Sequence, residues 1–143
     1  MTKAATIPAR LRIPAQEAAL DLLFPWLAAE AERRGVAAAL RPRLHLALEE
    51  AVSNIVRHGF APGQEGAVAI ALEDDRDGVR LVIEDDGARF DPAAATPPPR
   101  PATLAAAKPG GAGLALLRHA CDGIAYEIGP RGNCLTLSFR PRG

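Results

Sequence analysis

The chain has 143 residues, and its 17 Lys and Arg balance its 17 Asp and Glu. This length suits one folded domain, so we expect a single domain over residues 1–143. A balanced charge provides no overall basic surface for a nucleic acid, and no stretch approaches the roughly 18 uninterrupted apolar residues of a membrane span. We therefore expect a cytoplasmic protein whose partners include no nucleic acid and no membrane.

The N-terminal half predicts one strand and two helices. Apolar and polar residues alternate over 6–13, which indicates an edge strand. Leucines and alanines recur at helical spacing over 15–34, where Pro25 introduces a kink and Gly35 ends the helix. The range 42–59 predicts a second helix, because a proline at its first position costs no intrahelical hydrogen bond.

The C-terminal half predicts two hairpins, one helix and one long loop. The strands are expected over 66–73, 79–85, 124–128 and 135–139, with a helix over 114–121. The loop over 86–110 holds six of the 13 prolines, and its length is typical of a mobile lid over a ligand. Hairpin-linked strands and partly segregated helices predict an α+β fold, a two-layer sandwich with helices on one face of a mixed but mostly antiparallel sheet.

Glu50 and Asn54 lie one turn apart on a face beside the apolar stripe of the 42–59 helix. A carboxylate and a carboxamide so placed offer a base and oxygen ligands to one small volume, which suits Mg²⁺ that carries substrate phosphates. A solvated helix face would show the same pattern. Arg57 and His58 follow, and they could face phosphates or offset the negative end of the helix dipole.

A buried strand leads directly into the acidic turn Glu84-Asp85-Asp86-Gly87. Asp85 could accept a hydrogen bond from an amino group such as that of adenine, and Gly87 would let a flat ring approach the backbone. An ordinary acidic turn is the alternative interpretation.

Gly110, Gly111 and Gly113 come directly before the 114–121 helix, with Lys108 beside them. Backbone N–H groups at the start of a helix, and the positive end of its dipole, suit a phosphate. The Rossmann and Walker patterns are both absent, and a flexible linker to a helix is an equally good interpretation of these glycines.

Each of these segments is common by itself, but their order and spacing, with Gly132-Asn133 before the last strand, favour an ATP site. The two cysteines, Cys121 and Cys134, lack the spacing of metal ligands. We therefore expect them to be buried thiols.

The same order of segments resembles the histidine-kinase-like ATPase superfamily, which includes gyrase, Hsp90, histidine kinases and MutL. Within it, the chain is similar to the small anti-sigma-factor serine/threonine kinases. The stretches that carry the resemblance are LALEEAVSNIVRHGF (46–60), VIEDDGARFDP (82–92), GGAGLALLRHACDGIAY (110–126) and RGNCLTLSF (131–139). The resemblance implies a Bergerat-type ATP-binding fold.

The resemblance also implies roles for single residues. Glu50 would be the general base that activates an attacking hydroxyl, and Asn54 would bind Mg²⁺. Asp85 would bind the adenine amino group, with Gly87 beneath the ring. Further contacts to the nucleotide would come from His58, Lys108, Gly111, Gly113 and Asn133. The chain departs from the family pattern at Asn133, where threonine is common, and at Arg89, where many members have a second glycine.

The function implied is that of an ATP- and Mg²⁺-dependent serine/threonine kinase that is an anti-sigma factor. It would phosphorylate an anti-anti-sigma antagonist and sequester a sigma factor or comparable client. The alternatives are an ATP-binding interaction module that transfers no phosphate, and an α+β domain that binds no nucleotide. Glu50 favours the enzyme, since a pure binder needs no base. Leu23, Phe24 and Trp26 could serve either a homodimer or the core.

Overall fold

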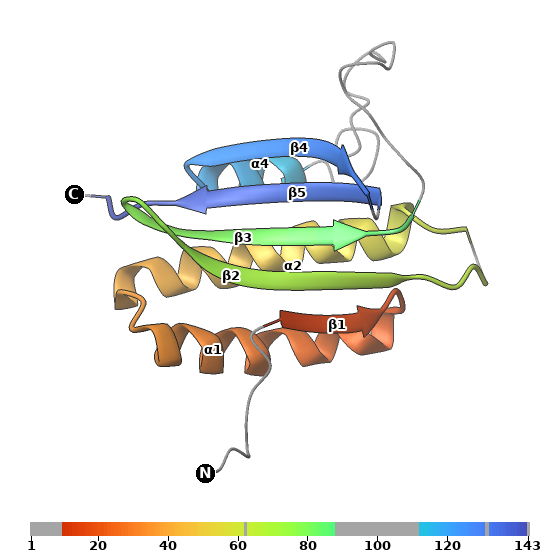
Figure 1. Ribbon diagram of the computed structural model, residues 1–143, viewed down its shortest axis with the longest axis horizontal. Helices are drawn as coiled ribbons and strands as arrows, with labels where there is room; N and C mark the ends of the chain where they lie inside the picture. Colours follow the sequence, from red (N-terminus) through yellow and green to blue (C-terminus); the bar gives the residue numbers. More distant parts are fainter. Residues whose placement is uncertain (1–9, 62, 88–111, 131, 143) are drawn as a thin grey trace.

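The structure, a computed structural model, describes residues 10–61, 63–87, 112–130 and 132–142 (Figure 1). Its strands form one sheet in the order β1-β2-β3-β5-β4, and each neighbouring pair is antiparallel. The strands are β1 (Arg10–Pro14), β2 (Ala67–Asp75), β3 (Gly78–Asp85), β4 (Gly123–Gly129) and β5 (Gly132–Phe139). Within the described residues, β1 and β4 are therefore the two edges of the sheet.

The described helices lie on one side of this sheet, with α2 running along its middle (Figure 1). The α-helices are α1 (Leu23–Arg34), α2 (Arg41–His58) and α4 (Ala112–Ala120), and the 3₁₀ helices are η1 (Glu17–Leu22) and η2 (Ala38–Leu40). The predicted α+β fold, with helices on one face of a mostly antiparallel sheet, is confirmed.

The segment predicted as one helix over 15–34 is divided into two helices of different type. The 3₁₀ helix η1 ends at Leu22 and α1 begins at Leu23, so Pro25 lies in the first turn of α1. There its missing N–H costs nothing. In a continuous α-helix, Pro25 could not donate to the carbonyl of Asp21 and its ring would collide with that carbonyl. The predicted kink is thus a change of helix type.

The other helix boundaries follow the sequence signals. Gly35 ends α1 in the left-handed conformation, with φ of 67° and ψ of 34°, and its N–H bonds to the carbonyls of Ala31 and Glu32. Pro42 lies in the first turn of α2, and Gly59 follows the last residue of that helix. Both boundaries confirm the predictions from glycine and proline.

The apolar core fills the space between the helices and the sheet. Fully buried members from α1, α2 and the three central strands include Leu27, Leu44, Leu48, Val52, Val68, Ile70, Leu81, Ile83, Leu137 and Phe139. Leu23 and Trp26, which the sequence left open between core and dimer surface, belong to this core. Phe24 instead is 41% exposed and packs on the His45 ring, with ring centroids 5.1 Å apart.

Cys121 is buried, and its Sγ donates to the carbonyl of Leu117 at 2.9 Å. Cys134 is half-buried, and burial raises the pKa of both thiols above their ordinary value. The prediction of buried thiols is confirmed for Cys121, whereas Cys134 keeps some exposure. None of the described helices combines the length and the apolar character needed to cross a membrane.

Candidate nucleotide site

Asp85, the last residue of β3, points toward the face of the sheet that the helices cover. It follows Leu81 and Ile83 in the alternation of the strand and is only 7% exposed. Its Oδ1 accepts hydrogen bonds from Nδ2 of Asn133 at 3.0 Å and from the backbone N–H of Gly87 at 2.8 Å. No described residue donates to Oδ2 of this carboxylate. Both described donors thus bond to Oδ1, and Oδ2 is left without a donor from the described residues.

Two glycines allow three segments to meet at this carboxylate. Gly132 has a φ of +126°, and a Cβ on it would come within 2.4 Å of the carbonyl oxygen of Asp85. A Cβ on Gly87 would lie 2.5 Å from the carbonyl oxygen of Gly59. Because Gly59 follows the last residue of α2, the Asp85 turn packs directly against the end of that helix.

The two carboxylates beside Asp85 point elsewhere. Glu84 lies on the opposite face of β3, where it forms an ion pair with Arg10 of β1. Asp86 accepts a hydrogen bond on Oδ1 from the backbone N–H of Ala67 at 3.0 Å. Of the three consecutive carboxylates at this strand end, Asp85 is the one directed toward the helices.

Glu50 and Asn54 share one face of α2, beside its buried stripe. Both are half-buried, and neither side chain forms an ion pair or hydrogen bond with another described residue. Between Asn54 and Gly59 an α-helix rises about 7.5 Å along its axis, against about 13.5 Å from Glu50. Asn54 is therefore the nearer of the two to the Asp85 turn along this axis, and Glu50 lies one turn behind it.

Arg43 lies on the same face of α2 as Glu50 and Asn54, and it connects that face to α4. Its Nε donates to the carbonyl of Ala120, the last residue of α4, at 3.1 Å. The two helices pack together and run in opposite directions (Figure 1). The nine residues of α4 rise about 12 Å, or about eight residues of α2. The start of α4, which contains Gly113, therefore comes level with the turn between Glu50 and Asn54.

Asp122, in the connection between α4 and β4, binds Arg43 at the end of α4 that lies away from Gly113. Its carboxylate accepts from Nη2 of Arg43 at 2.9 Å, from the backbone N–H of Arg140 at 2.6 Å and from Nη2 of Arg142 at 3.1 Å. Burial opposes the charge on Asp122, but these hydrogen bonds outweigh it and hold the pKa of the carboxyl below its ordinary value. Arg43 and Asp122 thus clamp the end of α4 to the start of α2.

The other predicted site residues are placed as follows. His58 is exposed in the last turn of α2. Arg57, beside it, forms an ion pair with Glu17 of η1 at 3.1 Å. Lys108, Gly111, Arg89 and the greater part of the predicted lid lie outside the described residues. The structure therefore brings Asp85, Gly87 and Asn133 into contact at the end of α2, and it places Glu50 and Asn54 along the same helix.

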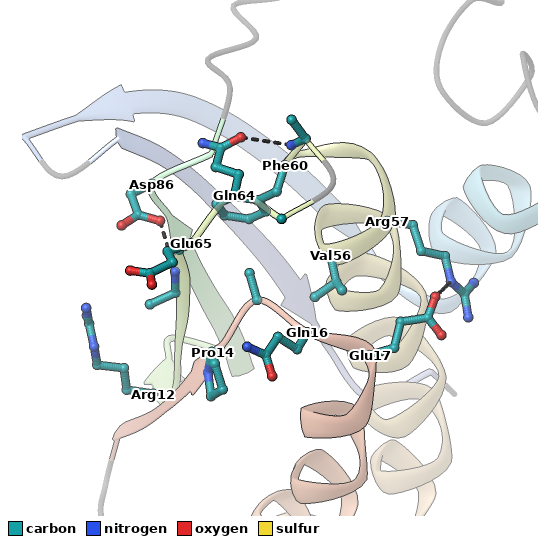
Figure 2. A pocket seen from close by; sticks show the side chains of 15 residues that line it. Arg12, Pro14, Gln16, Glu17, Val56, Arg57, Phe60, Gln64, Glu65 and Asp86 are labelled. Carbon is teal, nitrogen blue, oxygen red and sulfur yellow. Dashed lines mark hydrogen bonds and ion pairs between the residues drawn. The ribbon is translucent and has the colours of Figure 1, made fainter.

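A cavity of about 1020 Å³ lies beside the end of α2, between β1, the start of η1 and residues 60–61 and 63–66 (Figure 2). Its lining includes Arg12, Gln16, Phe60 and Asp86, but neither Asp85 nor Asn54. Figure 2 shows the Arg57–Glu17 ion pair on one wall and Asp86 on the opposite side. Asp86, the neighbour of Asp85, lies on the wall of this cavity, and a smaller cavity of about 390 Å³ is lined by Arg12, Glu84, Asp85 and Asp86.

The chemistry of these residues suits a nucleotide. Oδ2 of Asp85 is a buried acceptor for an amino group, and the start of α4 offers backbone N–H groups to a phosphate. Glu50 and Asn54 carry oxygen atoms of the kind that Mg²⁺ binds together with substrate phosphates. In the described part of the chain, no group of three or more His, Cys, Asp or Glu could hold a metal ion by itself.

Sequence reasoning missed Tyr126 of β4, whose hydroxyl donates a hydrogen bond to Oδ1 of Asn133. The alternation of the last hairpin places Tyr126 on the same face as Ile124 and Ile128, but it does not give the register between β4 and β5. The register pairs Tyr126 with Leu135, diagonally next to Asn133. Only the pairing of the strands reveals this contact.

Comparisons with known proteins identify the family of this chain. The sequence profile described as "Histidine kinase-like ATPase domain" matches residues 13–139. A relative from Bordetella bronchiseptica, the serine/threonine-protein kinase BtrW, is 42% identical over 120 residues, which cover 84% of each chain. A crystal structure of the RsbU and RsbW domains of a Mycobacterium tuberculosis protein covers 92% of this chain with a TM-score of 0.57 and 21% identity. This chain spans 32% of that longer chain, and the likeness concerns the fold alone. The chain belongs to the histidine kinase-like ATPase family.

Proposed function

We propose that this protein is an ATP-dependent serine/threonine protein kinase that acts as a cytoplasmic anti-sigma factor. It phosphorylates an anti-anti-sigma antagonist and binds a sigma factor or comparable client, with ATP and Mg²⁺ as cofactors. The observation that carries the proposal is the pair Glu50 and Asn54, half-buried, one turn apart and without partners among the described residues. The similarity to BtrW, a serine/threonine-protein kinase, supports the same class of reaction.

In this proposal the chain contributes positioning and one proton acceptor. ATP, when bound with Mg²⁺, would supply a γ-phosphoryl group whose charge the metal ion offsets. Glu50 would accept the proton of the attacking serine or threonine hydroxyl, and it forms no ion pair with a cation among the described residues. Asn54 would provide an oxygen ligand to the metal ion. Because Glu50 lies one turn behind Asn54, the acceptor hydroxyl would approach from the side away from Asp85.

The base of the nucleotide would lie against the turn at the end of β3. Oδ2 of Asp85 would accept a hydrogen bond from the amino group of adenine, and Gly87 would lie beneath the ring. Asn133 already bonds to Asp85, so it would act at the floor of this pocket. The remaining proposed contacts to the phosphates come from His58, Lys108, Gly111 and Gly113.

The experiment that tests this proposal is phosphoryl transfer to a protein. The protein is incubated with γ-labelled ATP, Mg²⁺ and candidate antagonist proteins encoded nearby, and each product is analysed for labelled serine or threonine. We expect one antagonist to be labelled, and only in the presence of the kinase. If ATP binds in a calorimetric titration but no antagonist is labelled, the ATP-binding interaction module becomes the better account. If no nucleotide binds, the site itself is wrongly interpreted.

A further inference from the structure

We propose that Tyr126 is a positioning residue that sets the preference of the nucleotide site for adenine, because it fixes the side-chain amide of Asn133 against Asp85. This inference rests on the proposed function, since it requires a nucleotide base beside Asp85. It concerns a residue on the edge strand β4, which is connected to the proposed base site through Asn133.

Three side chains from three neighbouring strands form one chain of hydrogen bonds. The hydroxyl of Tyr126 donates to Oδ1 of Asn133, and Nδ2 of Asn133 donates to Oδ1 of Asp85 at 3.0 Å. The backbone N–H of Gly87 donates to the same Oδ1 at 2.8 Å. The chain therefore runs from β4 through β5 to the end of β3.

The orientation of the Asn133 amide determines whether a hydrogen-bond donor or an acceptor faces the Asp85 carboxylate. An asparagine amide carries an acceptor on one side and two donors on the other. The Tyr126 hydroxyl holds the acceptor side, so the NH₂ group faces the carboxylate. The reverse orientation would place the amide oxygen against the Asp85 oxygen, and two acceptors repel each other. Asn133 and Asp85 are each 7% exposed, so water screens this repulsion poorly.

This arrangement determines which base edge fits. Both described donors bond to Oδ1 of Asp85, and Oδ2 thus meets a ligand as an acceptor. Adenine presents an amino donor to it. Hypoxanthine has a carbonyl oxygen at the same ring position, and this oxygen would be repelled. Without the Tyr126 hydroxyl, the Asn133 amide loses the contact on its acceptor side. Its NH₂ group, although it still donates to Asp85, could then shift toward that carbonyl, and discrimination between the two bases would fall.

A purely structural role for Tyr126 predicts a different result. Tyr126 is half-buried on an edge strand, and its ring could serve only to stabilise the β4–β5 hairpin. Loss of the hydroxyl would then lower the stability of the protein. It would leave the ratio of the ATP and inosine triphosphate affinities unchanged, because both ligands would bind the same folded state.

The test is calorimetric titration of the full chain with ATP and with inosine triphosphate, for wild type and Tyr126→Phe. We expect Tyr126→Phe to weaken ATP binding by roughly fivefold to tenfold, as for the loss of one buried hydrogen bond, and to lower the ATP-to-inosine-triphosphate affinity ratio. The matched control is Thr136→Val on β5, whose side chain alternates to the opposite face of the sheet. It should keep the wild-type ratio. If Tyr126→Phe fails to fold, Tyr126→Met serves the same comparison.

A double-mutant cycle tests whether Tyr126 acts through Asn133. In an Asn133→Thr background the amide is absent, so addition of Tyr126→Phe should no longer change the affinity ratio. An equal fall of the ratio in both backgrounds would overturn the inference, as would a wild-type ratio in Tyr126→Phe. Both results would leave the proposed function standing. If wild type binds neither nucleotide, the proposed function fails and this inference fails with it.

Discussion

The carboxylate of Glu30, which has no exposed surface, accepts a hydrogen bond from Nε of Arg34 at 2.9 Å, one turn further along α1. Arg33 donates to the same carboxylate from Nη2 at 2.6 Å. Burial by itself would raise the pKa of Glu30, but the hydrogen bonds from both arginines outweigh it, and the pKa lies below its ordinary value of 4.5. The charged form of Glu30 therefore stabilises the folded state.

This lowered pKa predicts how stability depends on pH. Because the pKa is lower in the folded state, the stabilisation is fully present above pH 4.5 and is lost as the pH falls through the folded value. Urea unfolding should show a difference between wild type and Glu30→Gln that is largest at pH 7 and narrows below pH 4.5. Glu32→Gln, with a side chain 79% exposed on the same helix, should change stability little. A Glu30→Gln difference that is constant with pH would contradict this account.

The Arg43 clamp predicts that lysine cannot replace this arginine. The Arg43 guanidinium donates to the carbonyls of Ala120 and Arg140 and to the carboxylate of Asp122. A lysine ammonium lacks the planar fork needed to reach all three, so Arg43→Lys should lower the free energy of unfolding by about 2 kcal/mol. Arg118→Lys, on an exposed position of α4, is the matched control and should cost little. Equal unfolding midpoints for the two variants would contradict the clamp.

The close approach of β5 to Asp85 predicts that Gly132 tolerates no side chain. Gly132→Ala would strain a φ of +126° and place Cβ 2.4 Å from a carbonyl oxygen, so we expect a loss of at least about 2 kcal/mol of unfolding free energy. Gly129→Ala, which pairs with Gly132 across the turn of the same hairpin, is the control, because the nearest atom lies 3.9 Å away. A similar stability for both variants in denaturant titrations would show that this approach is not required.

Local signals predicted most of the fold. The helix over 42–59 was evident because apolar residues recur at helical spacing between Pro42 and Gly59. The break near Leu22 could be anticipated only as a kink, because the sequence shows the missing N–H of Pro25 but not the 3₁₀ geometry that avoids a collision with Asp21.

The sequence alone could not predict which strands lie beside each other in the sheet. Hairpins join strands that are neighbours along the chain, whereas the contact between Asp85 and Asn133 depends on β5, and not β4, lying beside β3. Nothing in the local pattern selects between those two orders. The candidate residues Asp85 and Asn133 were therefore identified singly, and their hydrogen bond, with Tyr126 behind it, emerged from the sheet topology.

The acceptor on Asp85 predicts how ATP stabilises the protein. At a hundredfold excess over its dissociation constant, ATP should raise the free energy of unfolding of wild type by about 2.7 kcal/mol. Asp85→Asn removes the charged acceptor, and most of this gain should disappear at the same ATP concentration in a thermal unfolding assay. Asp86→Asn alters the neighbouring carboxylate, which bonds to the backbone of Ala67, and should retain the gain. Equal gains in Asp85→Asn and wild type would show that Asp85 does not recognise adenine.

The most direct test of the kinase account compares two adjacent carboxylates on α2. Glu50 shares a face with Asn54, whereas Glu49 is exposed on a different face. Glu50→Gln keeps the size and hydrogen bonding of the side chain but removes the base. The assay is a single-turnover reaction with γ-labelled ATP and an unphosphorylated antagonist that wild type has been shown to phosphorylate. Glu50→Gln should bind ATP normally and transfer phosphate about 10² to 10⁴ times more slowly. Glu49→Gln should transfer at the wild-type rate. A wild-type rate of transfer in Glu50→Gln would contradict the proposal that Glu50 is the general base of the kinase reaction.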